Sequence, residues 1–587
     1  MKSKIAQFLA VLIVMTMIGA SLAACGATPE PQVVEKVVKE TVIVEGESQV
    51  VEKVVTEVVE VEKVVTPTAA PQSKIVTFAW TQEPDSLSWL YSNMWFSVIM
   101  QQLWHCWAWE YDDQNLSFPK LVTEIPSVDN GGVSEDGLTI TMNLRDDIVW
   151  SDGTPITAND FVFTYEMIMN TGNSVASQYP YDYLASVEAP DDRTVVMNFD
   201  EPFAPWEALF WRGVLPKHIL EPVFEAEGSI DAAEWNRVPT VGCGPFVAAE
   251  WESGSYLRFV KNPNYFDGEA KLDEVYFQFV PDDASQTAAL VAGDALLGTF
   301  PPLSDVPILE AGNLDIVVQS SGYVEGWYFN LRDMASPAMR DVNVRQAIAM
   351  GIDRQAIVDD LLFGLTTTIE TLWDPIAAYG YVSPDIEPWT YDPEAAKALL
   401  DEAGWIDTDG DGIRDKDGVK LTLTHGTTTR AIRQDIQAVA QQSLREIGID
   451  LQIYNYNSDL FFGSWSDGSP AALGDLDIMQ WSDSTMFPDP DQQYWLCSEL
   501  PTDDNPYGYN YFVCDEELDA LLQQQIKTVD SDERVAIFQQ ITKYIHENVY
   551  FLGLYDDADY WIVNPRLTGV KFSGVTPFYN IVEWDLQ

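Results

Sequence analysis

This sequence has few histidines and few cysteines, and its cysteines lie far apart in the chain. The 587 residues include four histidines and five cysteines, and no two cysteines stand close together in the chain. Zinc sites are built from clusters of these two residue types. The composition therefore argues against a zinc protein, and no pattern in the chain requires a cofactor.

Positively charged residues are also few. Against 92 Asp and Glu stand 32 Lys and Arg, which gives a formal net charge of −60. A surface of this sign repels nucleic acid and anionic lipid headgroups. We therefore expect no nucleic-acid partner. Solubility alone accounts for the acidic excess, and attraction of cationic ligands is a second interpretation.

The common catalytic signatures are absent as well. The chain has no Gly-x-Ser-x-Gly elbow and no Gly-Lys dipeptide, which excludes a Walker phosphate loop. His546 and Glu547 begin a zincin-like string, but Tyr550 stands where the second histidine is needed. We expect a protein that is not an enzyme. A glycosidase needs only two carboxylates, so an exported glycoside hydrolase is the alternative from another class.

The N-terminus has the pattern of an export signal. Lys2 and Lys4 precede an apolar run, residues 5–20, that is short for a membrane span, and residues 22–25 read Leu-Ala-Ala-Cys. This pattern resembles a bacterial lipoprotein signal. We expect residues 1–24 to be removed and Cys25 to carry the lipids that anchor the chain to the outer side of the cell membrane. An ordinary signal peptide is the alternative.

A low-complexity Val/Glu/Lys segment occupies residues 25–73 after the predicted cleavage site. The string Val-Val-Glu-Lys-Val-Val occurs at Val33–Val38 and again at Val50–Val55. We expect a flexible tether that holds the rest of the chain away from the membrane. A 3-4-3-4 spacing of valines from Val51 to Val65 makes a short coiled coil the alternative.

From residue 74 onward the sequence predicts an α/β body with more than one lobe. β-branched and aromatic residues predict strands over residues 75–80, 138–144, 194–199, 256–260 and 275–280. Asp392 and Gly404 bound a predicted helix, and Thr157 with Asp160 forms a capping box before another. Asp353 and Asp515 have the position of further N-caps. A chain of this length must form several cores.

Four cysteines remain after the predicted lipidation: Cys106, Cys243, Cys497 and Cys514. An even number is typical of exported proteins with disulfide bonds. Three pairings are possible. We favour Cys497 with Cys514, because the loop between them is short and costs little entropy to close.

One acidic loop has the spacing of calcium ligands. Oxygen-bearing side chains at Asp407, Asp409 and Asp411, the Ile413 carbonyl and Asp415 match the first part of a calcium-binding loop. Gly418 stands where the closing glutamate belongs. The alternative is a plain Asp/Gly turn without an ion.

Six sequence blocks then carry a family resemblance. The chain from about residue 74 to its end resembles the extracellular solute-binding proteins that serve ABC importers of peptides. Cys243 stands where many relatives have threonine, so its pairing with Cys106 is left open. The blocks are Trp150–Phe161, Gly242–Phe246 with Leu257–Val260, Asn262–Phe266, Tyr328–Leu331, Val344–Ile348 with Ile352–Arg354, and Tyr391–Ala396.

The resemblance implies a periplasmic-binding-protein-like clamp of two lobes with an extra inserted subdomain. Such a clamp closes on its ligand as a monomer and delivers it to the permease of an ABC importer. The first lobe would comprise residues 74–117, 216–325 and 560–587, the inserted subdomain residues 118–215, and the second lobe residues 326–559.

The resemblance also implies ligand-binding residues. In the family, an aspartate shortly after a tryptophan-bearing strand pairs with the α-ammonium of the peptide, and here Asp483 follows Trp481. Asp489 and Asp491 are alternatives for this role, and a loop-capping aspartate is the structural alternative. Trp327, Tyr328 and Asn330 stand at the expected crossing between lobes, where we expect Trp327 in the cleft.

The tryptophans of the chain make oligosaccharides a second possible class of ligand. Some family members bind oligosaccharides, and indole rings stack well on sugars. Packing in cores and lobe interfaces is the alternative for most of these side chains. We predict a peptide receptor, with an oligosaccharide receptor as the alternative within the family. The tryptophans concerned are Trp104, Trp107, Trp109, Trp327 and Trp481.

Overall fold

The computed structural model describes residues 33–44, 47–58, 73–92, 94–211, 213–462, 465, 468–484, 489–490, 493–502, 505, 510–574 and 576–587. The chain divides into two compact units, Met1–Gln72 and Ser73–Gln587. Among the described helices, none combines the length and the apolar character that a membrane crossing requires. Residues 1–24 and Cys25 lie outside the described residues.

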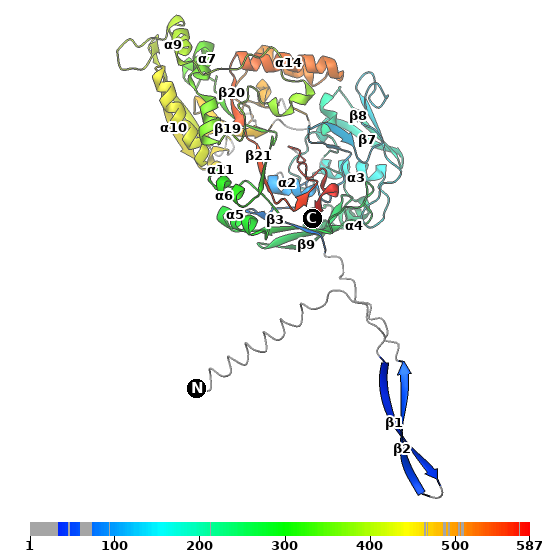
Figure 1. Ribbon diagram of the computed structural model, residues 1–587. Helices are drawn as coiled ribbons and strands as arrows, with labels where there is room; N and C mark the ends of the chain where they lie inside the picture. Colours follow the sequence, from blue (N-terminus) through cyan, green and yellow to red (C-terminus); the bar gives the residue numbers. More distant parts are fainter. Residues whose placement is uncertain are drawn as a thin grey trace, which may run out of the picture. The chain divides into compact units, whose positions relative to one another are not determined.

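The repeated valine strings form a β-hairpin (Figure 1). Strand β1 (Val33–Val44) pairs with β2 (Glu47–Val58) in an antiparallel register that places Val33 opposite Val58. The coiled-coil alternative is therefore wrong over these residues, and the predicted tether is not flexible chain there. The reason is that β-branched valine favours extended backbone, and each valine-rich strand has the other as a partner over its whole length.

A seven-stranded mixed sheet forms the centre of the first lobe. Its strand order is β13-β21-β12-β3-β11-β10-β9, with β3 parallel to both neighbours. The strands are β3 (Ile75–Trp80), β9 (Phe246–Glu252), β10 (Tyr256–Lys261), β11 (Glu274–Phe279), β12 (Leu297–Thr299), β13 (Asp315–Gln319) and β21 (Asp559–Val563). Nearby helices are α2 (Trp95–Gln101), α4 (Lys217–Glu227), α5 (Asp283–Ala292) and α6 (Val306–Ala311).

A smaller sheet lies in the inserted segment and shares its core with the first lobe. One cluster of buried residues runs without a break from Val76 through Ile140 and Val195 to Trp584. The inserted elements are β6 (Thr139–Asn143), β7 (Leu184–Asp191) and β8 (Thr194–Phe199), with helix α3 (Ala158–Met169). Short pairs are β4 (Trp109–Tyr111) with β5 (Ser117–Pro119) and β22 (Leu567–Thr568) with β23 (Asp585–Leu586).

The second lobe is built on a five-stranded sheet of order β18-β17-β19-β14-β20. Its strands are β14 (Tyr323–Phe329), β17 (Thr422–Thr428), β18 (Asp450–Tyr456), β19 (Ile478–Ser484) and β20 (Phe551–Asp556). The helices are α7 (Val342–Gly351), α8 (Arg354–Ala356), α9 (Pro393–Glu402), α10 (Ala431–Glu446), α11 (Ser458–Phe461), α12 (Pro470–Leu473), α13 (Glu516–Gln525) and α14 (Ser531–Glu547). A short ladder joins β15 (Asp415–Lys416) to β16 (Val419–Lys420).

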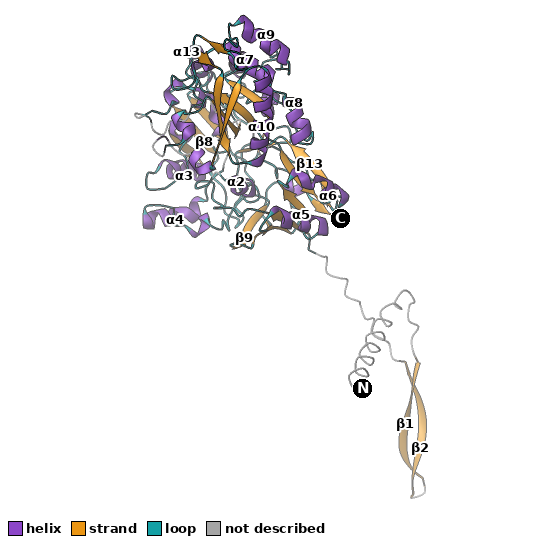
Figure 2. Ribbon diagram, turned by 90° about the vertical axis from the view of Figure 1, so that its left-hand side faces the viewer, coloured by secondary structure: helices purple, strands orange, loops and turns teal. Residues whose placement is uncertain are grey.

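Two separate cores cover the two faces of this sheet. Trp327 and Phe329 of β14 pack into the core that also holds residues of α7, α9 and α10. Val324 and Tyr328 pack into the core on the other side, with residues of α13 and α14. Figures 1 and 2 show these helices around the strands. The alternation of side chains along a strand separates the two sets.

The predicted caps are present. The Asp392 carboxylate accepts a hydrogen bond of 2.9 Å from the Ala395 N–H at the start of α9, and Asp353 and Asp515 cap α8 and α13. At the start of α3, the Thr157 N–H donates to Asp160 at 2.8 Å. Asp160 also accepts from the Lys217 N–H at 3.1 Å, so one carboxylate joins α3 to α4.

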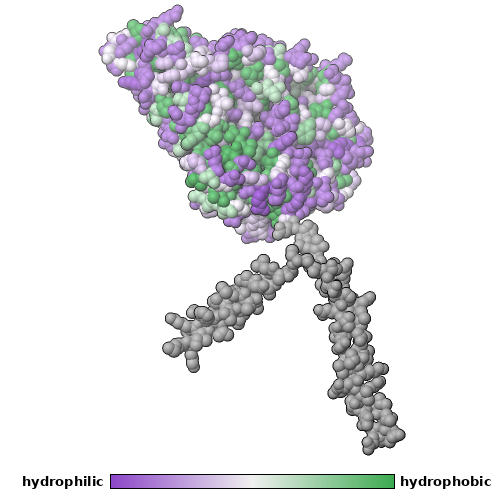
Figure 3. All heavy atoms as spheres, in the orientation of Figure 1, coloured by the Kyte–Doolittle hydropathy of each residue, from purple (hydrophilic) through white to green (hydrophobic). Residues whose placement is uncertain are grey.

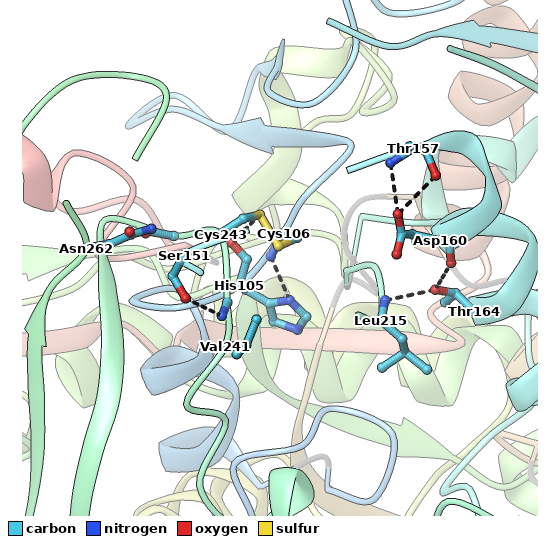
Figure 4. Close-up of a disulfide and its surroundings, with 12 residues drawn as sticks. His105, Cys106, Ser151, Thr157, Asp160, Thr164, Leu215, Val241, Cys243 and Asn262 are labelled. Atoms are coloured by element: carbon cyan, nitrogen blue, oxygen red, sulfur yellow. Dashed lines mark hydrogen bonds between the residues drawn. A yellow bond between two sulfur atoms is a disulfide. The ribbon is translucent and has the colours of Figure 1, made fainter. Parts of the chain in front are cut away.

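Cys106 pairs with Cys243 (Figure 4), and Cys497 pairs with Cys514. The second pairing is the one favoured from the sequence. Around Cys243 the chain passes very close to another segment, because a Cβ at Gly242 would stand 2.3 Å from the Trp104 carbonyl oxygen. This contact explains the glycines on both sides of Cys243.

Candidate functional site

Two chain crossings connect the sheets of the two lobes. One follows β13 and leads into β14, and the other follows β20 and leads into β21. The Ser321 hydroxyl donates to the Asp557 carbonyl at 2.7 Å, and the Asp557 N–H donates to the Tyr323 carbonyl at 3.0 Å. The crossings are therefore held together as one double connection.

A cavity of about 510 Å³ lies beside this double connection and is lined from both lobes. Figure 3 shows hydrophobic residues gathered on the same face, around the region where Figure 1 places β21. The volume of this cavity is in the range of pockets that bind small molecules. The lining residues are Trp95, Phe300, Pro301, Leu303, Ser321, Tyr323, Leu362, Arg430, Ile432, Ser482, Tyr555, Asp557, Ala558, Asp559 and Tyr560.

Two arginines near the cavity are engaged by carboxylates. Arg433 donates to both oxygens of Glu325, at 2.8 and 2.9 Å, and Glu325 is fully buried. Gln480 gives the same carboxylate a third hydrogen bond of 2.9 Å. Arg430 lies nearer the solvent and pairs with Asp557 at 3.1 Å. A buried carboxylate needs such partners to stay ionised.

Among the described residues, no Lys or Arg pairs with two further carboxyl groups at the second crossing, those of Asp556 and Asp559. Burial, together with the neighbouring Asp557 and Asp556, raises the pKa of the Asp559 carboxyl well above its ordinary value. Burial also raises the pKa of Asp556 to about 6. Oδ2 of Asp559 and Oδ1 of Asp556 have no hydrogen-bond partner within the described part of the chain. The crossing thus holds more carboxyl groups than cations, and burial favours the neutral form of Asp556 and Asp559.

The structure places Trp327 in the core of the second lobe and not in the cavity. Trp327 is fully buried, its indole N–H donates to Gln480 at 2.9 Å, and its ring lies 4.5 Å from that of His425. Alternation along β14 turns this side chain under α7 and α10. Asn330 is also fully buried and donates to the carbonyls of Gly474 and Leu476. Both residues therefore hold the lobe together.

Trp481 and Tyr328 lie together on the opposite face of the sheet. Their rings stack with centroids 4.0 Å apart and an interplanar angle of 9°. The half-buried Asp483 accepts hydrogen bonds from the Trp481 indole at 3.0 Å and from the Tyr511 hydroxyl at 2.7 Å. Tyr328, Trp481 and Asp483 do not line the cavity, whereas Ser482, which stands between the last two in the chain, does. A ligand-binding role for them stays a prediction.

The alternatives for the cation anchor differ in their surroundings. Asp489 is held by Arg534, whose Nη2 lies 2.6 Å from Oδ1 while Nη1 contacts Oδ2. Both side chains are 8% exposed, so the carboxylate already has a buried partner. Asp491 lies outside the described residues.

The tryptophans before the inserted subdomain belong to the core. Trp104 is fully buried and stacks on His105 at 4.6 Å, and Trp107 stacks on Trp211 at 5.8 Å. The Trp109 indole N–H donates to the Glu207 carbonyl at 2.9 Å. Packing therefore accounts for these three rings.

The acidic loop brings together part of the predicted calcium set. Carboxylate oxygens of Asp407, Asp409 and Asp411 lie within 4.8 Å of one another. The Lys420 ammonium contacts both Asp409 and Asp411, at 2.8 Å from the former. The Asp415 carboxylate instead accepts from Thr408, and the Ile413 N–H donates to Asp411. Calcium binding stays a prediction, which a calcium titration of the melting temperature tests.

Sequence reasoning missed the charged residues of the cavity. Arg430 follows β17, Asp557 lies between the two apolar strands β20 and β21, and Asp559 is the first residue of β21. The signal that could have found them is the acidic run from Asp556 to Asp559, because charged residues between two buried strands are costly unless they have a task.

The chain is similar over most of its length to known bacterial proteins. The oligopeptide-binding protein AppA of Bacillus subtilis is 29% identical over 514 residues, 86% of this chain and 90% of AppA. Its structure with a nonapeptide matches with a TM-score of 0.66 and 27% identity, over 88% of this chain and 99% of that one. NikZ of Campylobacter jejuni, in complex with Ni(L-His), matches with a TM-score of 0.69 at 23% identity, over 87% and 99%.

These relatives agree with the architecture of two lobes described above. The model of the bacterial extracellular solute-binding proteins, family 5, matches residues 119–503, which is more than half of the chain. That range includes the sheet of the inserted subdomain and strands β14, β17, β18 and β19 of the second-lobe sheet. The chain belongs to this family of extracellular solute-binding proteins.

Proposed function

We propose that this protein captures peptides and delivers them to the permease of an ABC importer. The observation that carries the proposal is the cavity at the lobe crossing, which is lined from both lobes and by ionisable and aromatic residues together, among them Arg430, Asp557 and Tyr560. A peptide fits such a lining, because it carries both charged groups and apolar side chains. The likeness to AppA, a protein named for oligopeptide binding, supports the same ligand class.

Ligand capture by closure of the lobes is part of this proposal. A ligand that touches both lobes stabilises the arrangement in which they are close, and the permease can distinguish that arrangement from the open one. The protein acts as a monomer and returns its ligand unaltered. An oligosaccharide is the alternative ligand, because aromatic side chains such as Trp95 and Tyr323 line the cavity and aromatic faces stack on sugar rings.

A thermal-shift screen of the purified protein, with peptide libraries and with neutral oligosaccharides, tests ligand binding. A peptide at one hundred times its Kd should add about 2.7 kcal/mol to the free energy of unfolding. Peptide recovered after incubation should have an unchanged mass. Stabilisation by oligosaccharides alone, or cleavage of the peptide, would contradict the proposal.

Anchoring through Cys25 completes the proposal. Acyl chains on Cys25 would keep the receptor beside its permease while the binding lobes stay in the aqueous phase. Labelled palmitate should enter the wild-type chain and be lost in Cys25→Ser, with Cys25→Ser found in the medium. Equal labelling of the two chains would contradict the anchor.

A further inference from the structure

The two lobes also meet at a place other than the double connection. The segment between α13 and α14 lies against the inserted subdomain, where the Ala204 N–H donates to the Ile526 carbonyl at 2.8 Å. The Ile526 side chain packs against the core that the inserted subdomain shares with the first lobe. We call this contact the clasp, and it is formed by residues 201–208 and 526–529.

Further contacts between the lobes accompany this backbone hydrogen bond. At the exposed edge of the clasp Lys527 pairs with Glu201, and an exposed pair of this kind contributes little to stability. Nearby, the Tyr379 hydroxyl donates to the Asn115 carbonyl at 2.7 Å and joins the second lobe to the first. Separation of the lobes would break these contacts together. A change of charge within the clasp therefore adds directly to the balance between touching and separated lobes.

One carboxyl group of the clasp interacts with charged groups of the opposite lobe. Glu207 belongs to the short 3-10 helix η2 (Ala204–Ala208) and is partly buried. From the second lobe, the negative charge of Asp489 and the positive charge of Arg534 act on it, and those two groups form a buried ion pair with each other. From the first lobe, Ser117 of β5 gives Glu207 a hydrogen bond.

The other titratable groups beside Glu207 are tyrosines. The charge of Glu207 contributes to the raised pKa of Tyr111, Tyr379 and Tyr381, so these phenols stay neutral at physiological pH. Burial and then Asp489 raise the pKa of Glu207 itself to about 7, against the opposing effects of the hydrogen bond and of the guanidinium. Among these groups, Glu207 is therefore the one that titrates near neutral pH.

Separated lobes would change the environment of this carboxyl group. Water would reach Glu207 and Asp489 would move away, so the pKa of Glu207 would return towards the ordinary value of about 4.3. Below that pH the carboxyl is protonated in both arrangements, and the clasp has its full strength. As the pH rises from there to about 7, the touching arrangement is weakened progressively, because separated lobes release the proton more readily.

We propose that the clasp is proton-sensitive: a protonated Glu207 keeps the inserted subdomain against the second lobe, and its ionisation near Asp489 favours separated lobes. The inference goes beyond the proposed function, because it concerns the protein without a ligand. The expected behaviour is a receptor whose lobes are closed in acidic surroundings and open at neutral pH and above.

Distances between two spin labels test the inference on the purified protein without ligand. The labels are attached to cysteines introduced at Asp129, an exposed residue of the inserted subdomain, and at Gln523, an exposed residue of α13. Double electron–electron resonance then separates the populations with short and long distances. We expect the ratio of closed to open protein to fall tenfold or more between pH 5 and pH 8. A ratio that stays constant or rises overturns the inference.

Two glutamine variants within the clasp assign the effect to one residue. Glu207→Gln has the shape of protonated glutamate, so the ratio should keep its acidic value at both pH values. Glu201→Gln is the matched control. Because Lys527 lowers the pKa of Glu201, that group stays ionised from pH 5 to pH 8, and its loss should leave the pH dependence in place. A pH dependence that persists in Glu207→Gln, or that is lost in Glu201→Gln, overturns the inference.

A third variant tests the charge effect independently of Glu207→Gln. Asp489→Asn removes the charge that opposes ionised Glu207 and leaves Arg534 to lower the pKa of that carboxyl. The fall in the ratio should then be smaller than in the wild type and should level off at a lower pH. Circular dichroism at both pH values shows which variants fold. A fall as large as that of the wild type overturns the inference, even where Glu207→Gln does not fold.

Discussion

Replacing Cys106 and Cys243 together by alanine should lower the free energy of unfolding by about 5 kcal/mol. This bond joins residues 137 apart in the chain, so it closes a loop that contains the whole inserted subdomain. Its main effect is on the unfolded chain, whose conformational entropy falls when distant residues are tied together. The longer the loop, the larger the entropy that the bond removes.

Removal of the second disulfide is the matched control, because that bond closes a much shorter loop. Cys497 and Cys514 are only 17 residues apart, so their replacement by alanine should cost about 3 kcal/mol. Chemical denaturation followed by circular dichroism measures both, with each lobe's transition fitted separately if the two do not coincide. A larger loss from the short loop than from the long one would contradict the entropic argument.

Arg433→Met should destabilise the second lobe by about 3–5 kcal/mol. The arginine donates two hydrogen bonds to Glu325, which is fully buried beneath the cavity, and a third to Thr428 at 2.9 Å. Methionine fills much of the space but removes both hydrogen bonds from the guanidinium, and leaves Glu325 with the more distant Arg430, whose Nη1 lies 3.9 Å from Oε2. An unpaired buried charge costs far more than the pair contributes.

Two further variants make this prediction specific. Arg445→Met lies on the same helix and removes an exposed ion pair with Asp450, so it should cost less than about 1 kcal/mol. Adding Glu325→Gln to Arg433→Met should restore part of the loss, because it removes the charge left behind. Urea unfolding of the three chains provides the comparison. A loss from Arg433→Met no larger than that from Arg445→Met would refute the argument.

Local signals in the sequence predicted local structure well. The strand over Ile75–Trp80 and the helix bounded by Asp392 and Gly404 both follow from neighbouring residues: β-branched and aromatic side chains in the first, a capping carboxylate and a glycine in the second. The valine-rich segment shows the limit. The spacing from Val51 onward fits a helix face, yet Glu47–Val58 forms a strand, because Val33–Val44 supplies an antiparallel partner along its whole length.

The sequence by itself determined the family, the α/β class and the caps, because ordered motifs and short-range hydrogen bonds are written in adjacent residues. Only the tertiary structure decided which residues line the cavity. Trp327 and Tyr328 are neighbours in the chain but face different cores, whereas Arg430 and Asp557 are 127 residues apart and form an ion pair. Side-chain direction and distant pairing depend on how the strands assemble, and that assembly is a property of the whole fold.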